Sequence, residues 1–243
     1  MMEWLDEGAE LLAVVVGIWL ALSMLSRRNE RWATGFSQRK FAVLLLVAAA
    51  VVLIEVTAEV LDHDSTALDR ALLLAIHRDV PAALLPLFSA ATRSGSAAFL
   101  VPAVAIACVL LAWWRHVFDA LALLLTTGVA SLVVYLAKSA VGRDRPELWT
   151  TNWYWGSSFP SGHTLSTAAI ATAAYFCTVR LRPQWRRPAF AIAFGWVAMV
   201  ALSRLVLGVH WPTDVLAAAC AGLLLAVMVN VALIRVRGLE AKP

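Results

Sequence analysis

Two stretches of the sequence place a histidine beside residues that could support its chemistry. The first reads FPSGHTLS and contains His163. The second reads SRLVLGVHWPTD and places His210 four residues before Asp214. Residues four apart share a face of a helical turn, although we expect Pro212 to interrupt this one. A carboxylate on one ring nitrogen fixes the tautomer and leaves the other nitrogen free to attack, while the second imidazole protonates a leaving oxygen. The pair therefore predicts group transfer through a histidine nucleophile and a histidine acid.

Three cations accompany the two histidines. Lys138 and Arg145 belong to the stretch KSAVGRDRP, and Arg204 precedes the second histidine. Clustered positive charges repel one another, so such a site calls for an anion with several oxygens, and arginine forks suit phosphate in particular. Ser161 and Gly162 open a predicted helix, whose free N–H groups and positive dipole end also bind anions. Gly162 would also let the backbone approach the ligand closely. Any one of these residues could instead be an interfacial side chain, but their convergence favours a phosphate site.

The same stretches offer no ligand set for a metal. No cluster of aspartate and glutamate gathers near them in the sequence to hold Mg²⁺. The cysteines Cys108, Cys177 and Cys220 stand apart inside apolar runs, without metal-ligand spacing. We therefore expect no metal and no cofactor, because the cations themselves can neutralise the charge of a phosphoryl-transfer transition state.

Apolar segments must hold these residues in place. The chain is 61% hydrophobic and 15% charged, whereas a soluble domain is about half apolar and about a quarter charged. The apolar residues come in long blocks, which is typical of membrane spans, and each span must be a helix because backbone groups in lipid are satisfied only internally. We predict an all-α polytopic transmembrane bundle. Its seven spans are Leu11–Ser26, Phe41–Val60, Ala97–Trp114, Val117–Ala137, Thr164–Val179, Ala189–Leu207 and Val215–Ile234.

Lysine and arginine set the predicted orientation. If the seven spans alternate, 13 of the 20 basic residues fall on one side, and the positive-inside rule makes that side cytoplasmic. The N-terminus then lies outside and the C-terminus inside. The four span ends that carry the candidate residues all meet on the extracytoplasmic face, so this topology brings the histidines together. The segment His63–Ser96 lies on the same face and is predicted to form one or two short helices at the interface.

The candidate residues resemble the signature of the type 2 phosphatidic acid phosphatase (PAP2) superfamily. That signature reads KxxxxxxRP, then PSGH, then SRxxxxxHxxxD, and the sequence matches every motif position between Lys138 and Asp214. The resemblance implies that His210 forms a phosphohistidine, that Asp214 orients it and that His163 is the general acid. It further implies that the phosphate is bound by Lys138, Arg145, Ser161, Gly162 and Arg204.

The resemblance also implies an architecture and a location. Members of the family have a six-helix core, which matches the second to seventh predicted spans. We therefore expect an extra N-terminal span and a cytoplasmic loop at residues 1–40, a phosphatase core at 41–235 and a cytoplasmic tail at 236–243. The protein is expected in a bacterial-type cytoplasmic membrane, with its site on the outer side.

Membrane members of the family act on lipid phosphates or diphosphates. The expected partners are therefore a lipid phosphate substrate and membrane lipids, and the modest net charge of +4 does not indicate a nucleic-acid surface. Undecaprenyl diphosphate, phosphatidylglycerol phosphate, phosphatidic acid and lipid A phosphate all fit the same anion site. The sequence predicts no particular oligomeric state.

The alternatives to a lipid phosphatase are a phosphotransferase and a transporter, and the pattern disfavours the transporter. A phosphohistidine could pass its phosphate to a second lipid, which would make the protein a phosphotransferase. A transporter would need interrupted helices and charges near the midplane, whereas these charges lie at helix ends. Glu55 and Glu59 are either helix-packing residues or part of a route to the site. The aromatic residues of the loop before PSGH form either an interfacial belt or a cover that grips a lipid chain: Trp149, Trp153, Tyr154 and Trp155.

Overall fold

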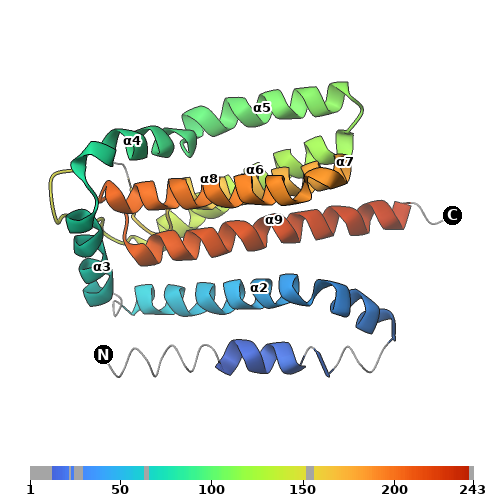
Figure 1. Ribbon diagram of the computed structural model, residues 1–243, viewed down its shortest axis with the longest axis horizontal. Coiled ribbons are helices and arrows are strands. Elements are labelled where there is room, and N and C mark those ends of the chain that lie inside the picture. Colours follow the sequence, from blue (N-terminus) through green and yellow to red (C-terminus); the bar gives the residue numbers. More distant parts are fainter. Residues whose placement is uncertain (1–12, 22, 25–29, 63–65, 152–155, 241–243) are drawn as a thin grey trace.

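The computed structural model describes residues 13–21, 23, 24, 30–62, 66–151 and 156–240, which form helices and connecting turns without a strand. In chain order the elements are α2 (Glu30–Leu61), α3 (Thr66–Asp79), η1 (Ala82–Leu84), α4 (Leu85–Ser94), α5 (Ala97–Trp113), α6 (Val117–Val141), α7 (Gly162–Leu181), η2 (Pro183–Trp185), α8 (Arg186–Val206) and α9 (Pro212–Glu240). The long helices run side by side, and α3 lies across one of their ends (Figure 1). The predicted all-α bundle is confirmed.

Helix α7 is the centre of the bundle and packs against α6, α8 and α9. Its contact with α9 is close because Gly222 of α9 has no side chain. A Cβ atom at Gly222 would lie 2.5 Å from the carbonyl oxygen of Leu165 and 2.8 Å from the Cβ atom of Ala168. Small residues let helix backbones approach one another in membranes, where association depends on packing. This contact fixes the start of α7 relative to the start of α9.

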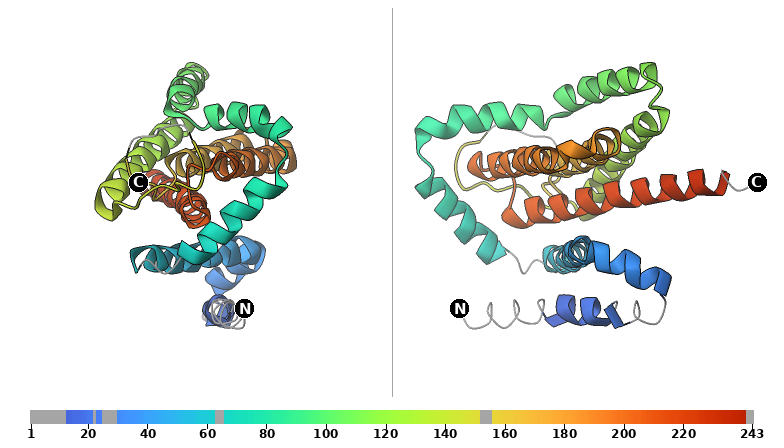
Figure 2. Two further views of the ribbon diagram at one scale, coloured as in Figure 1. Left: turned by 90° about the vertical axis from the view of Figure 1, so that its left-hand side faces the viewer. Right: turned by 45° about the vertical axis from the view of Figure 1, so that its right-hand side comes forward.

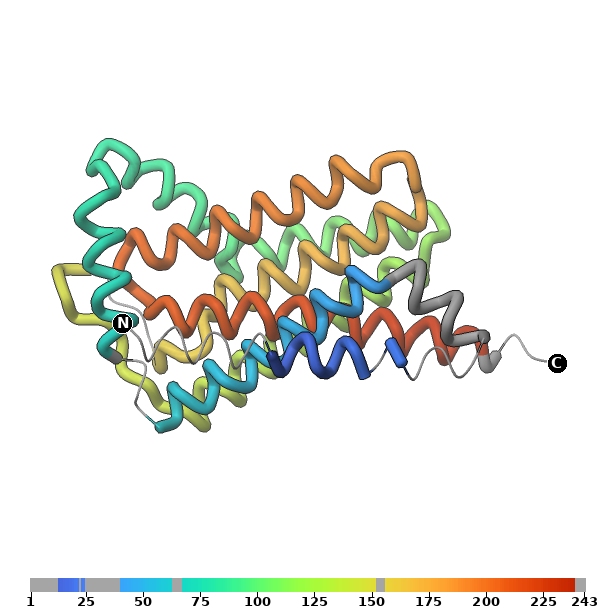
Figure 3. The backbone as a smooth tube through the Cα atoms, turned by 60° about the horizontal axis from the view of Figure 1, so that its bottom comes forward, coloured from blue at the N-terminus to red at the C-terminus, as the bar shows by residue number. Residues whose placement is uncertain are grey.

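The other helices surround this centre. Helix α2 lies along α9, where Val60 and Phe159 pack with Ala217 (Figure 3). On another side of the bundle, α5 packs on α6 and α4 packs on α8 (Figure 2). Helix α3 contacts both α8 and α9, so it covers the end of the bundle at which these two helices meet.

A polar cluster joins three helices at the other end of the bundle. Arg180, in the last turn of α7, donates from Nε to Asp119 Oδ1 of α6 at 2.7 Å and from Nη1 to Asn230 Oδ1 of α9 at 2.6 Å. Its guanidinium also lies 4.9 Å from the centre of the Phe118 ring. Arg180 is one of the 13 basic residues on the predicted cytoplasmic side, just after the predicted fifth span, and the structure places it inside α7 with specific partners.

Four of the described helices are long and apolar enough to cross a membrane by themselves: Lys40–Leu61, Val117–Val141, Pro183–Val206 and Pro212–Gly238. A fifth crossing results if the bent pair Ala67–Asp79 and Ala82–Ser94, with axes at 92°, counts as one span. Two predicted spans are weaker by this measure. Helix α5 has 17 residues, and α7 has 20 but is less apolar. Helix α7 can carry buried polar residues such as Thr164 and Thr167 because its neighbours cover it.

Three further predictions concern local structure. The segment His63–Ser96 contains the short helices α3 and α4, as expected. Pro212 does not interrupt a turn: it is the first residue of α9, where a missing N–H costs no hydrogen bond. Within the first predicted span, Leu11–Ser26, residues 13–21, 23 and 24 are helical and the others lie outside the described residues. Outside them too are three of the loop aromatics, Trp153, Tyr154 and Trp155.

Candidate active site

All eight predicted site residues lie at one end of the bundle, where α6 and α8 end and α7 and α9 begin (Figure 1). The two starts are joined directly, because the Ser161 N–H donates to the carbonyl oxygen of Asp214 at 3.2 Å. His163, in the first turn of α7, lies close enough to His210 that a second proton on either ring would disfavour one on the other. The positive charges of three nearby side chains also disfavour a second proton on His163: Arg204, Arg145 and Lys138. The fold therefore brings both histidines and all three cations to one place.

His210 lies in the turn between α8 and α9 and is only 2% exposed. The turn is tight because Gly208 adopts a left-handed conformation, with a φ angle of 67°. The Nδ1 atom of His210 lies 3.4 Å from Asp214 Oδ2, and its Nε2 atom lies 3.3 Å from Arg145 Nη1. A proton on Nδ1, directed at Asp214, leaves the lone pair on Nε2, the nitrogen beside Arg145.

Burial keeps the imidazole of His210 neutral. It lowers the pKa of His210 from 6.5 to about 4, because a charged ring is poorly solvated inside the protein. The hydrogen bond to Asp214 and the charge of that carboxylate act in the opposite direction, and Arg204 and Arg145 add to the lowering. At neutral pH the ring is therefore neutral, and its Nε2 atom keeps the lone pair that a nucleophilic histidine would need.

Lys138 and Arg145, the two cations of the first motif, both donate hydrogen bonds to the loop before α7. Arg145 donates from Nη1 to the carbonyl oxygen of Val209 at 2.8 Å and from Nε to that of Gly156 at 3.1 Å. Lys138 donates from Nζ to the carbonyl oxygen of Ser157, which Arg145 Nη2 also approaches at 3.4 Å. Arg145 thus ties the loop before α7 to the turn that carries His210.

Of the remaining predicted residues, Arg204 and Ser161 are buried and Gly162 is partly buried. Arg204 is 1% exposed and donates from Nη1 to Thr92 Oγ1 of α4 at 2.5 Å. Ser161 is fully buried, and its hydroxyl lies 3.0 Å from that of Thr164. Gly162 begins α7, and a Cβ atom there would lie 3.2 Å from Val134 Cγ1 of α6. Packing against α6 therefore favours glycine at position 162, in addition to the predicted close approach of a ligand.

Sequence reasoning missed three residues of this network. Arg143 lies in the loop of the first motif but at none of its fixed positions, and neither Asp69 nor Thr213 is a motif position. All three contact one another beside the turn that carries His210, and Arg143 also contacts Asp214. Arg143 could have been suspected from its place in the motif loop. Nothing in the sequence marks Asp69, because its partner Thr213 is 144 positions away.

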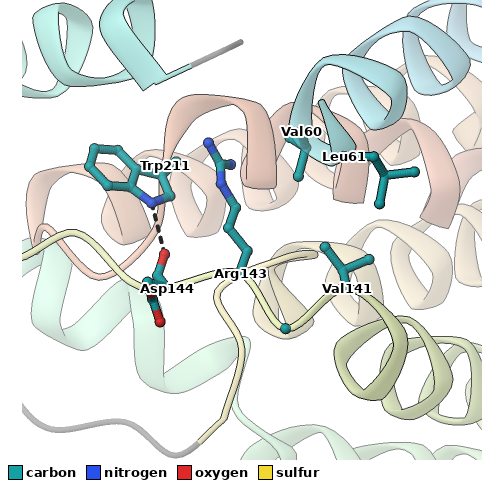
Figure 4. A pocket seen from close by; sticks show the side chains of 7 residues that line it. Val60, Leu61, Val141, Arg143, Asp144 and Trp211 are labelled. Carbon is teal, nitrogen blue, oxygen red and sulfur yellow. Dashed lines mark hydrogen bonds between the residues drawn. The ribbon is translucent and has the colours of Figure 1, made fainter. Parts of the chain in front are cut away.

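A cavity of about 330 Å³ opens beside this network (Figure 4). The Arg143 guanidinium lies 5.6 Å from the centre of the Trp211 ring, and Trp211 Nε1 donates to the carbonyl oxygen of Asp144 at 3.0 Å. The cavity is formed by the end of α2, the end of α6 with the loop after it, and the start of α9. Its lining residues are Val60, Leu61, Val141, Gly142, Arg143, Asp144 and Trp211.

Within the parts of the chain that the structure describes, no group of three or more His, Cys, Asp or Glu residues is placed to hold a metal ion. The cysteines Cys108, Cys177 and Cys220 are free thiols in three different helices.

Comparison with known proteins identifies the family. The family model of the PAP2 superfamily matches residues 119–236, which include all eight predicted site residues. Phosphatidylglycerophosphatase B of Bacillus subtilis (strain 168) is 31% identical over 142 residues, which cover 57% of this chain and 70% of that protein.

Two solved structures are similar to this one. The crystal structure of a transmembrane PAP2 type phosphatidylglycerolphosphate phosphatase from Bacillus subtilis matches with a TM-score of 0.71 and 27% identity, over 81% of this chain and 97% of that chain. Aquifex aeolicus LpxE matches with a TM-score of 0.55 and 23% identity, over 67% of this chain and 94% of that chain, which is a likeness of fold. The family match, the identity to a family member over most of its length and the apolar helices agree. The chain therefore belongs to the PAP2 superfamily, and it is an integral membrane phosphatase of that family.

Proposed function

We propose that the protein hydrolyses a phosphate or diphosphate group on a membrane lipid through a phosphohistidine formed on His210. The observation that supports this most is the position of His210. Its Nδ1 atom faces Asp214 and its Nε2 atom faces Arg145, in a neutral, buried ring. A nucleophile held in one tautomer beside a cation is suited to attack a phosphorus atom whose oxygens that cation binds.

The proposed reaction has two steps. First, Nε2 of His210 bonds to phosphorus while the bond from phosphorus to the lipid oxygen breaks, and His163 gives that oxygen a proton. Second, water attacks the phosphohistidine, its proton passes to His163, and the bond from phosphorus to nitrogen breaks. The charge on the phosphoryl oxygens is neutralised by Lys138, Arg145 and Arg204. A phosphate bound among these residues also favours the protonated form of His163, which its role as acid requires.

The substrate is proposed to be a lipid because the site lies at the end of helices that are long and apolar enough to cross a membrane. Relatives named phosphatidylglycerophosphatase B make phosphatidylglycerol phosphate the first lipid to test. Undecaprenyl diphosphate, phosphatidic acid and lipid A phosphate carry the same reacting group and complete the panel. Discrimination among them would depend on the lipid portion, since the residues around His210 contact only the anion in this proposal.

The test is phosphate release by the purified protein across these lipids in mixed micelles, with the product lipids identified by mass spectrometry. We expect release from at least one lipid and a loss of at least about 1,000-fold in His210→Ala. His116→Ala is the matched control, because His116 lies in the turn before α6, at the other end of the bundle. Turnover should survive EDTA. Full turnover in His210→Ala would refute the nucleophile, and phosphate recovered on a second lipid instead of in solution would identify a phosphotransferase.

A further inference from the structure

We infer that Asp69 and Arg143 are positioning residues for this reaction: together they hold the Asp214 carboxylate in the orientation that aligns His210. Neither residue belongs to the three motifs. The inference rests on the proposed function, in which His210 is the nucleophile.

Arg143 bridges two buried carboxylates. Its Nη1 atom lies 2.6 Å from Asp214 Oδ1, and its Nη2 atom lies 2.7 Å from Asp69 Oδ2. Both carboxylates are fully buried, and the Arg143 side chain is 11% exposed. The side chain reaches them between Trp211 and Val60, at the wall of the cavity (Figure 4). A planar guanidinium that contacts two carboxylates at these distances fixes both of them relative to its own plane.

Asp69 also binds the first turn of α9. Its Oδ1 atom accepts from the Thr213 N–H at 2.9 Å, and its Oδ2 atom accepts from the Thr213 hydroxyl at 2.5 Å. The N–H groups of a first helical turn have no partner within their own helix, and a carboxylate also complements the positive end of the helix dipole. Asp69 therefore anchors α3 to the residue that directly precedes Asp214.

These contacts restrain rotation of the Asp214 carboxylate. Arg143 binds Oδ1, while Oδ2 accepts from the Trp211 N–H at 2.9 Å and faces His210 Nδ1 at 3.4 Å. A rotation of the carboxylate breaks at least one of these contacts in a buried site, where an unpaired charge is costly. Asp69 of α3 and Arg143 of the loop after α6 thus set the plane of the Asp214 carboxylate. Through that carboxylate they also set the orientation of the His210 ring.

The network also sets the charge next to His210. Asp69, Arg143 and Asp214 together carry one negative charge. Loss of Arg143 leaves two negative charges, which favours protonated His210, whereas loss of the charge on Asp69 leaves none. The other charged and titratable groups that act on this site come from every neighbouring element: Lys138 of α6, Arg145 of the loop, His163 of α7 and Arg204 of α8.

The experiment compares Asp69→Asn, Arg143→Gln and the double variant Asp69→Asn/Arg143→Gln in the full-length protein. We expect each single variant to lower kcat about tenfold while KM changes by less than about twofold, because the phosphate-binding cations are untouched. The acid limb of kcat/KM should move to higher pH in Arg143→Gln and to lower pH in Asp69→Asn. The double variant restores the net charge, so its limb should return toward that of the wild type. A residue that only supported folding would not produce these opposite shifts.

Two further variants keep the test decisive. Arg143→Lys retains the charge but not the fork, and it serves if Arg143→Gln does not fold; we expect a lower kcat with an unshifted acid limb. Asp79→Asn is the matched control on α3, because Asp79 forms an exposed ion pair with Arg78 at 2.7 Å.

The outcomes separate the two proposals. If wild-type turnover does not depend on His210, the proposed function is wrong and this inference falls with it. If turnover depends on His210 but Asp69→Asn and Arg143→Lys match the wild type in kcat and in pH profile, the inference alone is wrong.

Discussion

The proposed nucleophile requires a neutral ring, and burial decides the pH at which His210 is neutral. Its pKa is lowered to about 4, so the ring gains a proton only in acid. We expect kcat/KM, which reports the free enzyme, to fall about tenfold per pH unit below about pH 4. Asp214→Asn removes the carboxylate that raises the pKa of His210, so its acid limb should lie lower still. The measurement is the pH profile of phosphate release for both proteins.

The lipid phosphate titrates as well, so its ionisation must be measured by ³¹P NMR in the same micelles and divided out of the profile. His116→Ala should keep the wild-type profile, since His116 lies at the far end of α6. If the corrected acid limb stayed at the ordinary histidine value of 6.5, burial would not be controlling His210.

At the scale of residues, the sequence predicted the motif positions, and the predicted topology placed those positions on one face of the membrane. It could not predict the supports behind them. Arg204 binds Thr92, which is 112 positions away, and Asp69 binds Thr213 across 144 positions. Contacts of this range depend on where α3 and α4 fold back over the bundle, and no local spacing encodes that. Arg143 was visible in the motif loop, but its partners were not.

At the scale of elements, the site depends on the contact between α7 and α9. We expect Gly222→Ala to destabilise the protein by about 1–3 kcal/mol and to lower turnover, because the added methyl group meets rigid backbone on α7. A Cβ atom at Gly222 would lie 2.5 Å from the carbonyl oxygen of Leu165. To relieve that contact the helices must move apart, and they carry His163 and Asp214 at their starts. Thermal unfolding in detergent and phosphate release are the measurements.

Two other helix glycines are matched controls for this prediction. Gly128 of α6 and Gly195 of α8 have nothing within 4 Å of a built Cβ atom. Alanine has the higher helix propensity, so Gly128→Ala and Gly195→Ala should leave unfolding unchanged or raise its midpoint. If Gly222→Ala behaved as they do, close packing of α7 on α9 would not be what positions the site.

The sequence predicted the helices well and their environments less well. Its apolar blocks predicted α5, α6, α8 and α9 with starts close to those observed, but α6 continues past Ala137 to Val141 and α9 continues past Ile234 to Glu240. It predicted seven spans, yet α7 is less apolar than the four helices that could each cross a membrane alone, and its neighbours shield it. The environment of Arg180 could not be predicted either, because its pairing with Asp119 and Asn230 depends on the helices that surround it. Hydropathy measures how apolar a segment is, and it does not register which neighbours will cover that segment.

At the scale of the whole molecule, the two ends of the bundle differ in chemistry. One end carries His163, His210, the cations around them and α3, while the other carries short basic turns that include Arg115, Arg182 and Arg186. Lysine and arginine outside a phosphate site mark the cytoplasmic side of a membrane protein. We therefore propose that the histidine end faces away from the cytoplasm and that the substrate is taken from the outer leaflet.

Cysteine labelling tests this orientation. Asp79→Cys places an exposed thiol at the histidine end, and Gln184→Cys places one in the turn at the other end. In intact cells a membrane-impermeant maleimide should label Asp79→Cys, whereas Gln184→Cys should react only after permeabilisation. The wild type supplies the background, because its cysteines lie within α5, α7 and α9. If only Gln184→Cys were labelled in intact cells, the orientation would be the opposite of the one proposed. Because the two thiols stand at opposite ends of one packed bundle, that result would also move the whole site, with both histidines, to the cytoplasmic leaflet.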